Sequence, residues 1–334
     1  MGETRAIAVM GATGRQGRGI VDALTFNKGD IEYQVRPLTR SLTSKLARNF
    51  ERDYPLLTLT KWDPNDRESL QKCFEGCYGA FVDSGFLYEP GMELDGWLSA
   101  ELQLGDFIRE AAEHAHLKHI VYPTFPSISR ASNGEIQIRH FEIKHQIALQ
   151  LRGSKVPSTI LCPGPFYTDF QDMGYASFDS AAGVVVFSTP APPQKRMGWS
   201  DPGHDIGWFA RAVLDAGYEV LKDLEEVPVC GQNVSYEELA SKFSAVTGIK
   251  AEYRQCGVEE FGEREGTQGV KGMEAKELGR WLAVAPDGKT CYGTIEVDVL
   301  ELVERKLGVK ALSWEKFLER TGWRGPKKEG EYRR

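Results

Sequence analysis

Three glycines form the pattern with the clearest chemical meaning. They stand in Gly11-Ala12-Thr13-Gly14-Arg15-Gln16-Gly17, directly after the apolar stretch Ala6–Met10 and at the start of an amphipathic segment. Glycine there permits a tight turn, close approach of the backbone to a pyrophosphate, and close packing of helix on strand. The helix start offers unpaired N–H groups and a positive dipole end to phosphates. We therefore predict a dinucleotide site that includes Gly11, Thr13, Gly14, Arg15, Gln16 and Gly17; the alternative is a glycine-rich turn that binds no nucleotide.

The end of the second predicted strand bears on which dinucleotide binds. An NAD site would carry Asp or Glu there, to accept hydrogen bonds from the adenosine ribose. The sequence has Leu38-Thr39-Arg40 instead. Arg40, with Lys45 and Arg15 nearby, can bind a 2′-phosphate through charge-assisted hydrogen bonds. We predict NADP(H) as the cofactor; the alternative for Arg40 and Lys45 is a solvated surface cation.

Polar residues also follow the third and fourth predicted strands. Asp63 is placed for the adenine side of a dinucleotide, and Asp83 and Ser84 are placed for the nicotinamide-ribose side. Either aspartate could equally cap a helix. Both interpretations stay open from the sequence.

The elements that must position these residues alternate along the first half of the chain. Short apolar strands are predicted at Ala6–Met10, Tyr33–Thr39, Leu56–Thr60, Ala80–Asp83, His119–Tyr122 and Ser158–Leu161. Helices are predicted at Gln16–Phe26, Ser44–Glu51, Arg67–Phe74, Leu98–Ala115 and Phe141–Leu151. This alternation indicates βαβ units, and so an α/β fold with a Rossmann-type, doubly wound parallel sheet.

After Leu161 the chain becomes rich in proline and glycine, before helices are predicted again at Asp205–Ala216 and Tyr236–Thr247. We predict an NAD(P)-binding Rossmann domain over residues 1–162. Residues 163–330 are predicted to form a smaller α+β portion that binds substrate or a partner and is interleaved with the Rossmann sheet.

Composition restricts the classes of partner. The 334 residues are 41% hydrophobic and 27% charged, with a net charge of −7, which argues against nucleic-acid binding. No apolar run approaches the roughly 18–20 residues of a membrane span. The N-terminus lacks the pattern of a signal peptide, so a cytoplasmic location is expected. The six cysteines show no metal-site spacing, and no metal is expected; we interpret them as reduced, although Cys73 and Cys77 are close enough for a redox pair.

Several segments together resemble the NmrA-like family, an atypical branch of the short-chain dehydrogenase/reductase superfamily. They are the glycine turn, Arg40, Trp62-Asp63, Val121-Tyr122-Pro123-Thr124 and His140-Phe141-Glu142-Ile143-Lys144, followed by Val156–Leu161, Phe166-Tyr167-Thr168-Asp169 and, less clearly, Leu312–Phe317. The resemblance covers most of the chain. Its most specific part is the His-Phe-x-x-Lys segment, and it implies that Phe166, Tyr167, Thr168 and Asp169 lie near the cofactor.

The resemblance also implies candidate catalytic residues. Ordinary short-chain reductases carry Tyr-x-x-x-Lys, in which the tyrosine protonates a carbonyl and the lysine binds the nicotinamide ribose. Here Lys144 matches the lysine, but His140 occupies the tyrosine position. His140 is either a proton donor or a histidine at the helix entry. Tyr122 and Tyr167 are further candidate donors, and Thr124 stands near the position of the superfamily's substrate-polarising serine.

Two functions remain open from the sequence. The first is an NADPH-dependent oxidoreductase that reduces a small organic carbonyl or conjugated double bond, in the manner of family members from secondary metabolism. The second is a non-catalytic NADP(H) redox sensor or transcriptional regulator that acts through a protein partner, which the missing tyrosine favours.

Overall fold

A seven-stranded parallel sheet organises the molecule. The computed structural model describes residues 3–26, 31–85, 93–231, 233–264 and 270–326. The strand order is β3-β2-β1-β4-β5-β6-β10, and every neighbouring pair is parallel. The strands are β1 (Glu3–Val9), β2 (Ile31–Thr39), β3 (Thr60–Lys61), β4 (Gly79–Phe81), β5 (His119–Pro123), β6 (Ser158–Pro163) and β10 (Val227–Val229). The predicted Rossmann-type α/β fold is therefore confirmed.

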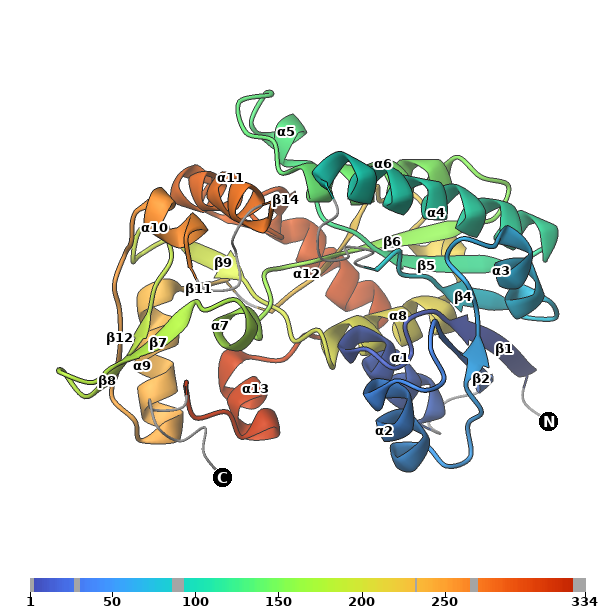
Figure 1. The fold of residues 1–334 in the computed structure, drawn as a ribbon, viewed down its shortest axis with the longest axis horizontal. Coiled ribbons are helices and arrows are strands. Elements are labelled where there is room, and N and C mark those ends of the chain that lie inside the picture. Colours follow the sequence, from blue (N-terminus) through green and yellow to red (C-terminus); the bar gives the residue numbers. More distant parts are fainter. Residues whose placement is uncertain (1–2, 27–30, 86–92, 232, 265–269, 327–334) are drawn as a thin grey trace.

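Helices cover both faces of this sheet (Figure 1). One layer holds α3 (Arg67–Phe74), α4 (Leu94–His114) and α6 (Arg139–Arg152); the opposite layer holds α1 (Arg15–Thr25), α2 (Lys45–Asp53) and α8 (Asp205–Ala216). Each layer has its own apolar core, so Ile7 and Val9 of β1 face one core and Ala8 faces the other. Burial on both faces explains why the strands read as nearly continuous apolar runs.

The second half of the chain contributes to this sheet. Strand β10 pairs with β6 at the sheet edge, and α8 packs against α1. Glycines allow the two helices to approach closely, because a Cβ at Gly207 would lie 2.1 Å from the carbonyl oxygen of Gly19. Residues beyond 162 thus return to the Rossmann core. The division of the chain at residue 162 stays a prediction.

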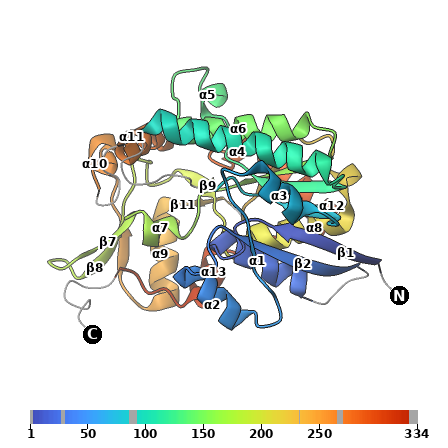
Figure 2. The same cartoon turned by 45° about the vertical axis from the view of Figure 1, so that its right-hand side comes forward.

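Most of the remaining elements gather beside the carboxyl ends of the strands (Figure 2). The sheet β12-β8-β7 comprises β7 (Ala176–Asp179), β8 (Val184–Phe187) and β12 (Ala251–Tyr253), and two smaller pairs comprise β9 (Arg196–Gly198) with β11 (Asn233–Ser235) and β13 (Lys289–Thr290) with β14 (Ile295–Glu296). The helices are α5 (Ile128–Ala131), α7 (Asp169–Asp172), α9 (Tyr236–Thr247), α10 (Val258–Gly262), α11 (Val270–Val284), α12 (Val297–Leu307) and α13 (Trp314–Thr321), with a 3-10 turn at Tyr218–Val220. The exceptions are α12, which packs on β10 and α8, and the 3-10 turn, which packs on α8 and contacts His119 at the start of β5. An aromatic-rich core that includes Tyr167, Phe187, Trp199 and Trp314 holds this region together.

Most predicted elements agree with the structure, and three helices, Arg67–Phe74, Asp205–Ala216 and Tyr236–Thr247, begin and end as predicted. The prediction of a third strand over Leu56–Thr60 was wrong, because pairing occurs only at Thr60–Lys61. Leu56 is 96% exposed. The apolar run therefore lies in a loop before an edge strand. Its apolar residues Leu57 and Leu59 pack against the core and do not pair in the sheet.

Some negative findings concern the described residues alone. None of their helices combines the length and apolar character needed to cross a membrane. Within the same residues, no group of three or more His, Cys, Asp or Glu side chains is arranged to hold a metal ion. All six cysteines are free, and burial raises the pKa values of the Cys73 and Cys77 thiols.

Candidate functional site

The turn from β1 to α1 is shaped by its glycines. Gly11 has a φ of +66°, in the left-handed region that disfavours a side chain. A Cβ at Gly17 would lie 2.1 Å from the carbonyl oxygen of Gly11, so α1 packs directly against the turn. Gly14 is the N-cap of α1 and provides no side-chain cap. The N-cap residue therefore leaves the first N–H groups of this 11-residue helix available to an anion.

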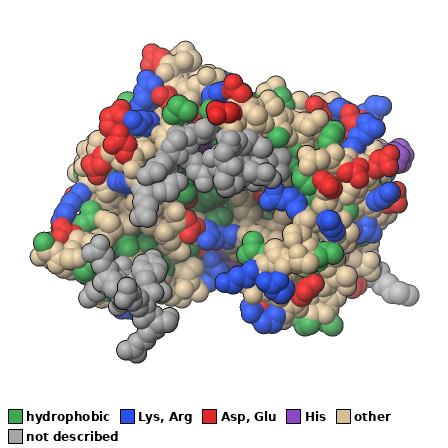
Figure 3. Space-filling model, in the orientation of Figure 1, with side chains coloured by type: hydrophobic (Ala, Val, Ile, Leu, Met, Phe, Trp, Pro, Cys, Tyr) green, Lys and Arg blue, Asp and Glu red, His purple; other side chains and the backbone are tan. Residues whose placement is uncertain are grey.

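A cavity of about 330 Å³ opens at this turn. Its lining comes from the carboxyl ends of β1, β2, β3 and β4, where open parallel sheets bind ligands. The β1 and β2 ends contribute Gly11, Thr13, Gly14, Thr39, Arg40 and Ser41. The other lining residues are Ser44, Leu46, Trp62, Asp83, Ser84 and Gly85. On the face drawn in Figure 3, Lys and Arg side chains gather near α1 and α2, beside the hollow in the middle of the molecule.

Arg40 lies at the end of β2, where the cavity meets the start of α2. Its side chain is exposed and makes no hydrogen bond or ion pair with any residue that the structure describes. Ser44 caps α2 by accepting a hydrogen bond from Ala47 N, 3.1 Å away. Lys45, the first residue of α2, is exposed and is not among the residues that line the cavity. The groups on this side that could bind an anion are therefore Arg40, two serine hydroxyls and a helix N-terminus.

Asp63 is engaged in a local turn. Its Oδ1 accepts a hydrogen bond from Asn65 N at 2.9 Å, and its side chain is exposed. The neighbouring residue, Trp62, lines the cavity instead. The structure thus brings the Trp62-Asp63 turn to the cavity, with the tryptophan rather than the carboxylate in its wall.

A buried polar network lies behind the part of the cavity wall that Asp83, Ser84 and Gly85 form. Lys144 Nζ donates a hydrogen bond to Ser84 Oγ at 2.9 Å and lies 2.7 Å from Glu101 Oε1. Ser84 in turn donates to Glu101 at 2.6 Å and lies 3.1 Å from the Tyr122 hydroxyl. Asp83 Oδ1 accepts from Gly85 N and lies 3.8 Å from Lys144 Nζ. Asp83, Ser84 and Lys144, far apart in the sequence, are therefore adjacent.

Electrostatics keep Lys144 charged in this buried position. Burial alone would lower the pKa of Lys144, but the charge of Glu101, with smaller effects from Tyr122 and Asp83, raises the pKa above its ordinary value. Tyr122 differs, because its complete burial raises the pKa of the phenol despite the nearby ammonium. Lys144 thus carries a fixed positive charge, whereas Tyr122 is a weak acid with no exposed surface.

Glu101 is the main residue that the sequence analysis missed. It lies on α4 and is completely buried. The only signal in the sequence is its spacing: Trp97 and Glu101 are four residues apart on α4, as His140 and Lys144 are on α6. Residues four apart share a helix face. Buried acidic residues are rare unless they are paired, so a glutamate on the apolar face of a helix indicates a buried cation nearby.

His140 lies one helical turn before Lys144, in the first turn of α6. Its Nδ1 is 2.6 Å from Glu274 Oε2, and its backbone N–H donates to the same oxygen at 3.0 Å. The ring stacks on Trp97, with 6.1 Å between the ring centroids and 23° between the planes. The His140 side chain is 15% exposed and that of Glu274 is 8% exposed. Glu274, on α11, is the second functional candidate that the sequence did not indicate.

The remaining predicted residues lie where the glycine turn meets the C-terminal part. Arg15 Nη1 is 2.5 Å from Asp172 Oδ2, so this cation is paired. Gln16 Oε1 is buried and has no hydrogen-bond partner among the described residues. Burial raises the pKa of Asp169 to about 7, although the hydrogen bond from Phe166 N opposes the shift. Asp169 therefore holds its proton more readily than an ordinary carboxyl group does.

Three further residues form ordinary structural contacts. Tyr167 is buried in the aromatic core, and its hydroxyl donates to the Leu312 carbonyl at 3.3 Å. Thr168 is buried at the start of α7, and Thr124 Oγ1 donates to the Phe125 carbonyl at 3.1 Å. Neither Tyr167 nor Thr124 lines the cavity at the glycine turn. These contacts provide no support for a proton-donor or substrate-polarising role.

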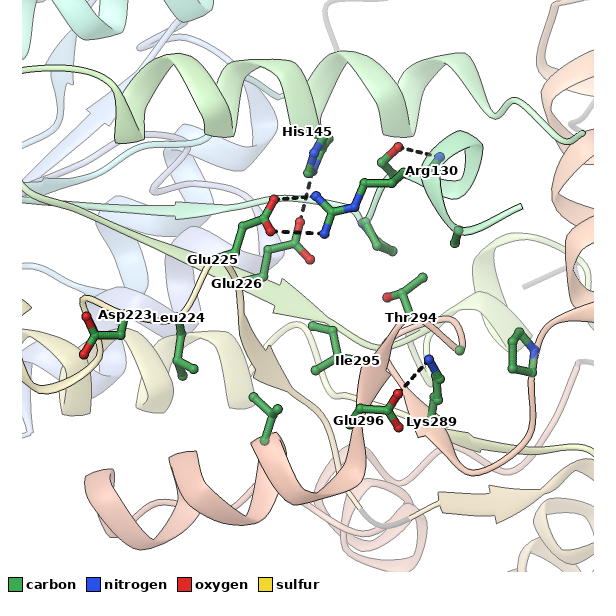
Figure 4. A pocket seen from close by; sticks show the side chains of 16 residues that line it. Arg130, His145, Asp223, Leu224, Glu225, Glu226, Lys289, Thr294, Ile295 and Glu296 are labelled. Carbon is green, nitrogen blue, oxygen red and sulfur yellow. Dashed lines mark hydrogen bonds and ion pairs between the residues drawn. The ribbon is translucent and has the colours of Figure 1, made fainter. Parts of the chain in front are cut away.

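A second cavity, of about 390 Å³, lies against α6 through His145 (Figure 4). Its cations are already paired: Arg130 contacts Glu225 at 2.6 Å, and Lys289 contacts Glu296 at 2.7 Å. His145 Nδ1 lies 3.0 Å from Glu226 Oε1. Because carboxylates neutralise these cations, this cavity suits a dinucleotide phosphate less well than the cavity beside Arg40.

Known proteins resemble this chain in sequence and in fold. Residues 3–273 match the model of the NmrA-like family. The NmrA-like family domain-containing oxidoreductase malD of Malbranchea aurantiaca is 27% identical over 259 residues, which cover 75% of each chain. The crystal structure of NmrA, a negative transcriptional regulator in complex with NAD, superposes with a TM-score of 0.75 at 20% identity, over 96% of this chain and 98% of the other.

A third similar protein is an enzyme. Triphenylmethane reductase of Citrobacter sp., complexed with NADP(H), superposes with a TM-score of 0.66 at 18% identity, over 94% of this chain and 99% of the other. At such identities the two structural matches show a shared fold. The match to the family model, in contrast, spans most of the sequence and includes the glycine turn and the His-Phe-x-x-Lys segment. The chain therefore belongs to the NmrA-like family.

Proposed function

We propose that this protein binds NADP(H) in the cavity beside the glycine turn. The residues fit that cofactor. The turn brings backbone N–H groups to a pyrophosphate, and a side chain at Gly17 would meet the backbone of Gly11. Arg40 has no partner among the described residues, so a 2′-phosphate can take its charge-assisted hydrogen bonds without breaking others. Asp83, Ser84 and Lys144 would hold the nicotinamide ribose.

We further propose an oxidoreductase that reduces a small organic carbonyl or conjugated double bond. The observation that carries this proposal is the ammonium of Lys144, which is buried and charged and donates a hydrogen bond at 2.9 Å to Ser84, a residue of the cavity wall. A bound reduced nicotinamide supplies a hydride to such a substrate. Lys144 would orient the ribose and stabilise negative charge that develops nearby. The relative from Malbranchea aurantiaca bears the name of an oxidoreductase, which supports this class of reaction.

The setting of the reaction is also a proposal. A role in secondary metabolism and a cytoplasmic location are consistent with the family resemblance and with the composition of the chain. A small-molecule substrate is the partner that this function requires. Neither membrane nor nucleic acid has a part in it.

A sensor remains the second candidate, and three observations favour it. The ammonium of Lys144 is already paired with Glu101, and histidine replaces the tyrosine acid. The structural neighbour NmrA is described as a transcriptional regulator. In this second function, occupancy by NADP(H) would change the affinity for a protein partner without turnover of the nucleotide.

Turnover of NADPH separates the two functions. Purified protein is incubated with NADPH and a panel of carbonyl and enone compounds, while the absorbance of the reduced nicotinamide is followed. A reductase shows saturable consumption with at least one compound. Gly14→Val should abolish this activity, because the added branches occupy space needed by the pyrophosphate. Saturable binding of NADP(H) with no turnover of any compound would favour the sensor.

Variants of Lys144 test the residue that carries the proposal. Lys144→Ala should weaken NADP(H) binding only modestly, since the phosphate contacts survive, but remove nearly all turnover. Lys144→Arg should not restore turnover, because the planar guanidinium of arginine cannot take the place of the compact ammonium. The double variant Lys144→Met, Glu101→Gln avoids an uncompensated buried carboxylate and so separates loss of function from loss of folding. Lys118→Ala is the control, an exposed lysine at the amino end of β5.

A further inference from the structure

We propose that His140 is the proton donor of the reaction and that Glu274, from α11, is the residue that positions it. The proposal rests on the reductase function above. It assigns a role to a residue 134 positions away along the chain. It also means that the C-terminal part of the molecule completes the reaction site that the Rossmann part begins.

The placement of His140 follows from two packed helices. On α6, His140 and Lys144 are four residues apart, which puts their Cβ atoms about 5–6 Å from each other on one face. On α4, Trp97 and Glu101 are also four residues apart, and this pair faces the pair on α6. Trp97 stacks on His140, and Glu101 pairs with Lys144. The histidine is therefore held one turn from the ammonium that donates to Ser84, a residue of the cavity wall.

Glu274 fixes the orientation of the imidazole. One of its oxygens, Oε2, receives both the His140 backbone N–H at 3.0 Å and a contact from Nδ1 at 2.6 Å. An ionised carboxylate only accepts hydrogen bonds, so the neutral ring carries its proton on Nδ1. This assigns proton exchange to Nε2, at the opposite end of the ring. Phe125 and Phe141 meet the ring edge-to-face, at centroid distances of 5.9 and 4.8 Å, and restrict its rotation.

The proton step balances with groups already named. The Nε2–H bond of the His140 imidazolium breaks, and an O–H bond forms on the substrate oxygen. The electron pair that completes the reduction comes from the reduced nicotinamide. Neutral imidazole then regains a proton from solvent. Throughout, Glu274 keeps its contact with Nδ1 and stabilises the imidazolium before the transfer, as a carboxylate does for a catalytic histidine.

A strained hairpin tip supports the involvement of the C-terminal part. Cys291 and Tyr292, between β13 and β14, have φ values of 50° and 61°, which non-glycine residues rarely adopt. The Tyr292 ring lies edge-on against Phe141 and Phe125, at centroid distances of 5.1 and 6.1 Å. Strained residues often gather at functional sites. Here the strain places a second C-terminal side chain against the aromatic group that surrounds His140.

Glu274 could instead serve only as a cap for the first turn of α6, so the test must distinguish positioning from stability. The variants are Glu274→Ala and Glu274→Gln, with His140→Ala for comparison. Glu277→Gln is the matched control, because Glu277 lies one turn along α11 and pairs with Arg280. Each variant is assayed for kcat and KM with NADPH, for NADP(H) affinity by calorimetry and for folding by circular dichroism.

A second readout is independent of activity. Nitrogen-15 NMR of labelled histidine reports which ring nitrogen carries the proton. At a pH that neutralises the imidazole, we expect wild type and Glu277→Gln to show the Nδ1–H tautomer at His140, and Glu274→Ala to lose it. We also expect Glu274→Ala and His140→Ala to lower kcat on the order of a hundredfold or more with cofactor affinity unchanged, which is the range for removal of a general acid.

The outcomes separate the two proposals. If His140→Ala and Glu274→Ala are as active as an active wild-type protein, the proton-donor assignment is overturned and the reductase function stands. If the variants are slow but His140 keeps its Nδ1–H tautomer in Glu274→Ala, the positioning role of Glu274 is overturned. A wild-type protein without any turnover overturns the reductase function and the donor role together. In that case the tautomer of His140 in Glu274→Ala still shows whether Glu274 orients the ring.

Discussion

Arg40 lines the cavity and Lys144 lies behind its wall, bonded to Ser84, and the surroundings of these two cations differ. Arg40 is exposed and contacts no described residue through a hydrogen bond or ion pair, whereas Lys144 is 6% exposed and bound to Glu101 and Ser84. An unpaired cation can gain interactions when a phosphate binds. A paired, buried cation gains few and instead provides a fixed charge at a fixed place. Arg40 is thus suited to selecting the cofactor, and Lys144 to orienting it.

Loss of Arg40 should remove the preference for NADP(H). Charge-assisted hydrogen bonds to the 2′-phosphate contribute roughly 1.5–3 kcal/mol, which corresponds to about a tenfold to hundredfold change in affinity. Arg40→Ala should therefore bind NADP(H) about as weakly as NAD(H), with NAD(H) affinity nearly unchanged. Calorimetric titration of both dinucleotides measures this. A variant that keeps the wild-type preference would show that another group binds the 2′-phosphate.

His119 should make the stability of the protein sensitive to acid. Burial lowers its pKa from 6.5 to about 4, and its Nε2 lies 2.8 Å from Thr159 Oγ1. The unfolded chain therefore binds a proton at a higher pH than the folded protein does. Stability is retained above pH 6.5 and is lost as the pH falls from there towards 4.

The contribution of His119 to this loss of stability can be measured by comparing wild type with a His119 variant. The loss attributable to His119 between pH 7 and pH 5 is about 2 kcal/mol. His119→Gln has no group to protonate, so its stability should fall less over this interval than that of wild type. Chemical denaturation at both pH values gives the comparison, and the difference cancels the opposite contribution of Asp169. Parallel losses in the two proteins would contradict the prediction.

At the scale of elements, the contact between β1, its turn and α1 depends on the absence of side chains. Gly11 adopts a positive φ, and the backbone of Gly17 packs on the carbonyl of Gly11. The same principle recurs where α1 meets α8, through Gly19 and Gly207. These contacts put the N-terminus of α1 at the cavity and bring α8, from the second half of the chain, under the sheet.

A single methyl group at Gly17 should disturb this arrangement. The Cβ of Gly17→Ala would lie 2.1 Å from the Gly11 carbonyl oxygen, a backbone atom that cannot rotate away. We expect a loss of about 1–3 kcal/mol in stability and a larger loss of dinucleotide affinity, because the turn must shift. Gly257→Ala is the control, since its Cβ would meet nothing within 4 Å. Normal binding by Gly17→Ala would mean that α1 tolerates a larger separation from the turn.

At the scale of the whole molecule, the C-terminal helix α13 is tied to the start of α8. Asp201 is completely buried, and its Oδ2 accepts hydrogen bonds from Arg320 Nε at 2.9 Å and Nη2 at 2.6 Å. Asp205, also buried, accepts from Leu312 N at 3.0 Å. Hydrogen bonds therefore connect the segment that follows α12 to α8, the helix that packs on the Rossmann sheet. These bonds couple the two parts of the chain.

Removal of Arg320 should weaken this connection. Arg320→Ala leaves the buried carboxylate of Asp201 without its cation, at a cost of roughly 1.5–3 kcal/mol. Lys316→Ala, on the same helix, removes a pair whose two side chains are 65% and 54% exposed, and should change stability by less than about 1 kcal/mol. Thermal unfolding compares the three proteins. Equal melting temperatures for the two variants would show that the Asp201–Arg320 pair does not hold α13.

The sequence by itself determined the features that depend on neighbouring residues. The glycine spacing after an apolar strand predicted the strand-turn-helix unit, because glycine permits backbone conformations and close contacts that other residues forbid. Apolar periodicity predicted helices such as Asp205–Ala216, because one face of a helix must be buried. The third strand was placed wrongly at Leu56–Thr60, since pairing at a sheet edge depends on the partner strand and not on local hydrophobicity.

Only the tertiary structure decided what surrounds the catalytic candidates. Glu101 and Glu274 lie 43 and 134 residues from their partners Lys144 and His140, and in sequence they resemble other glutamates on amphipathic helices. Whether a carboxylate is solvated or buried against a cation depends on which helix faces pack together. That packing sets the charge of Lys144 and the orientation of His140, because in a buried site the nearest charge dominates the electrostatic energy.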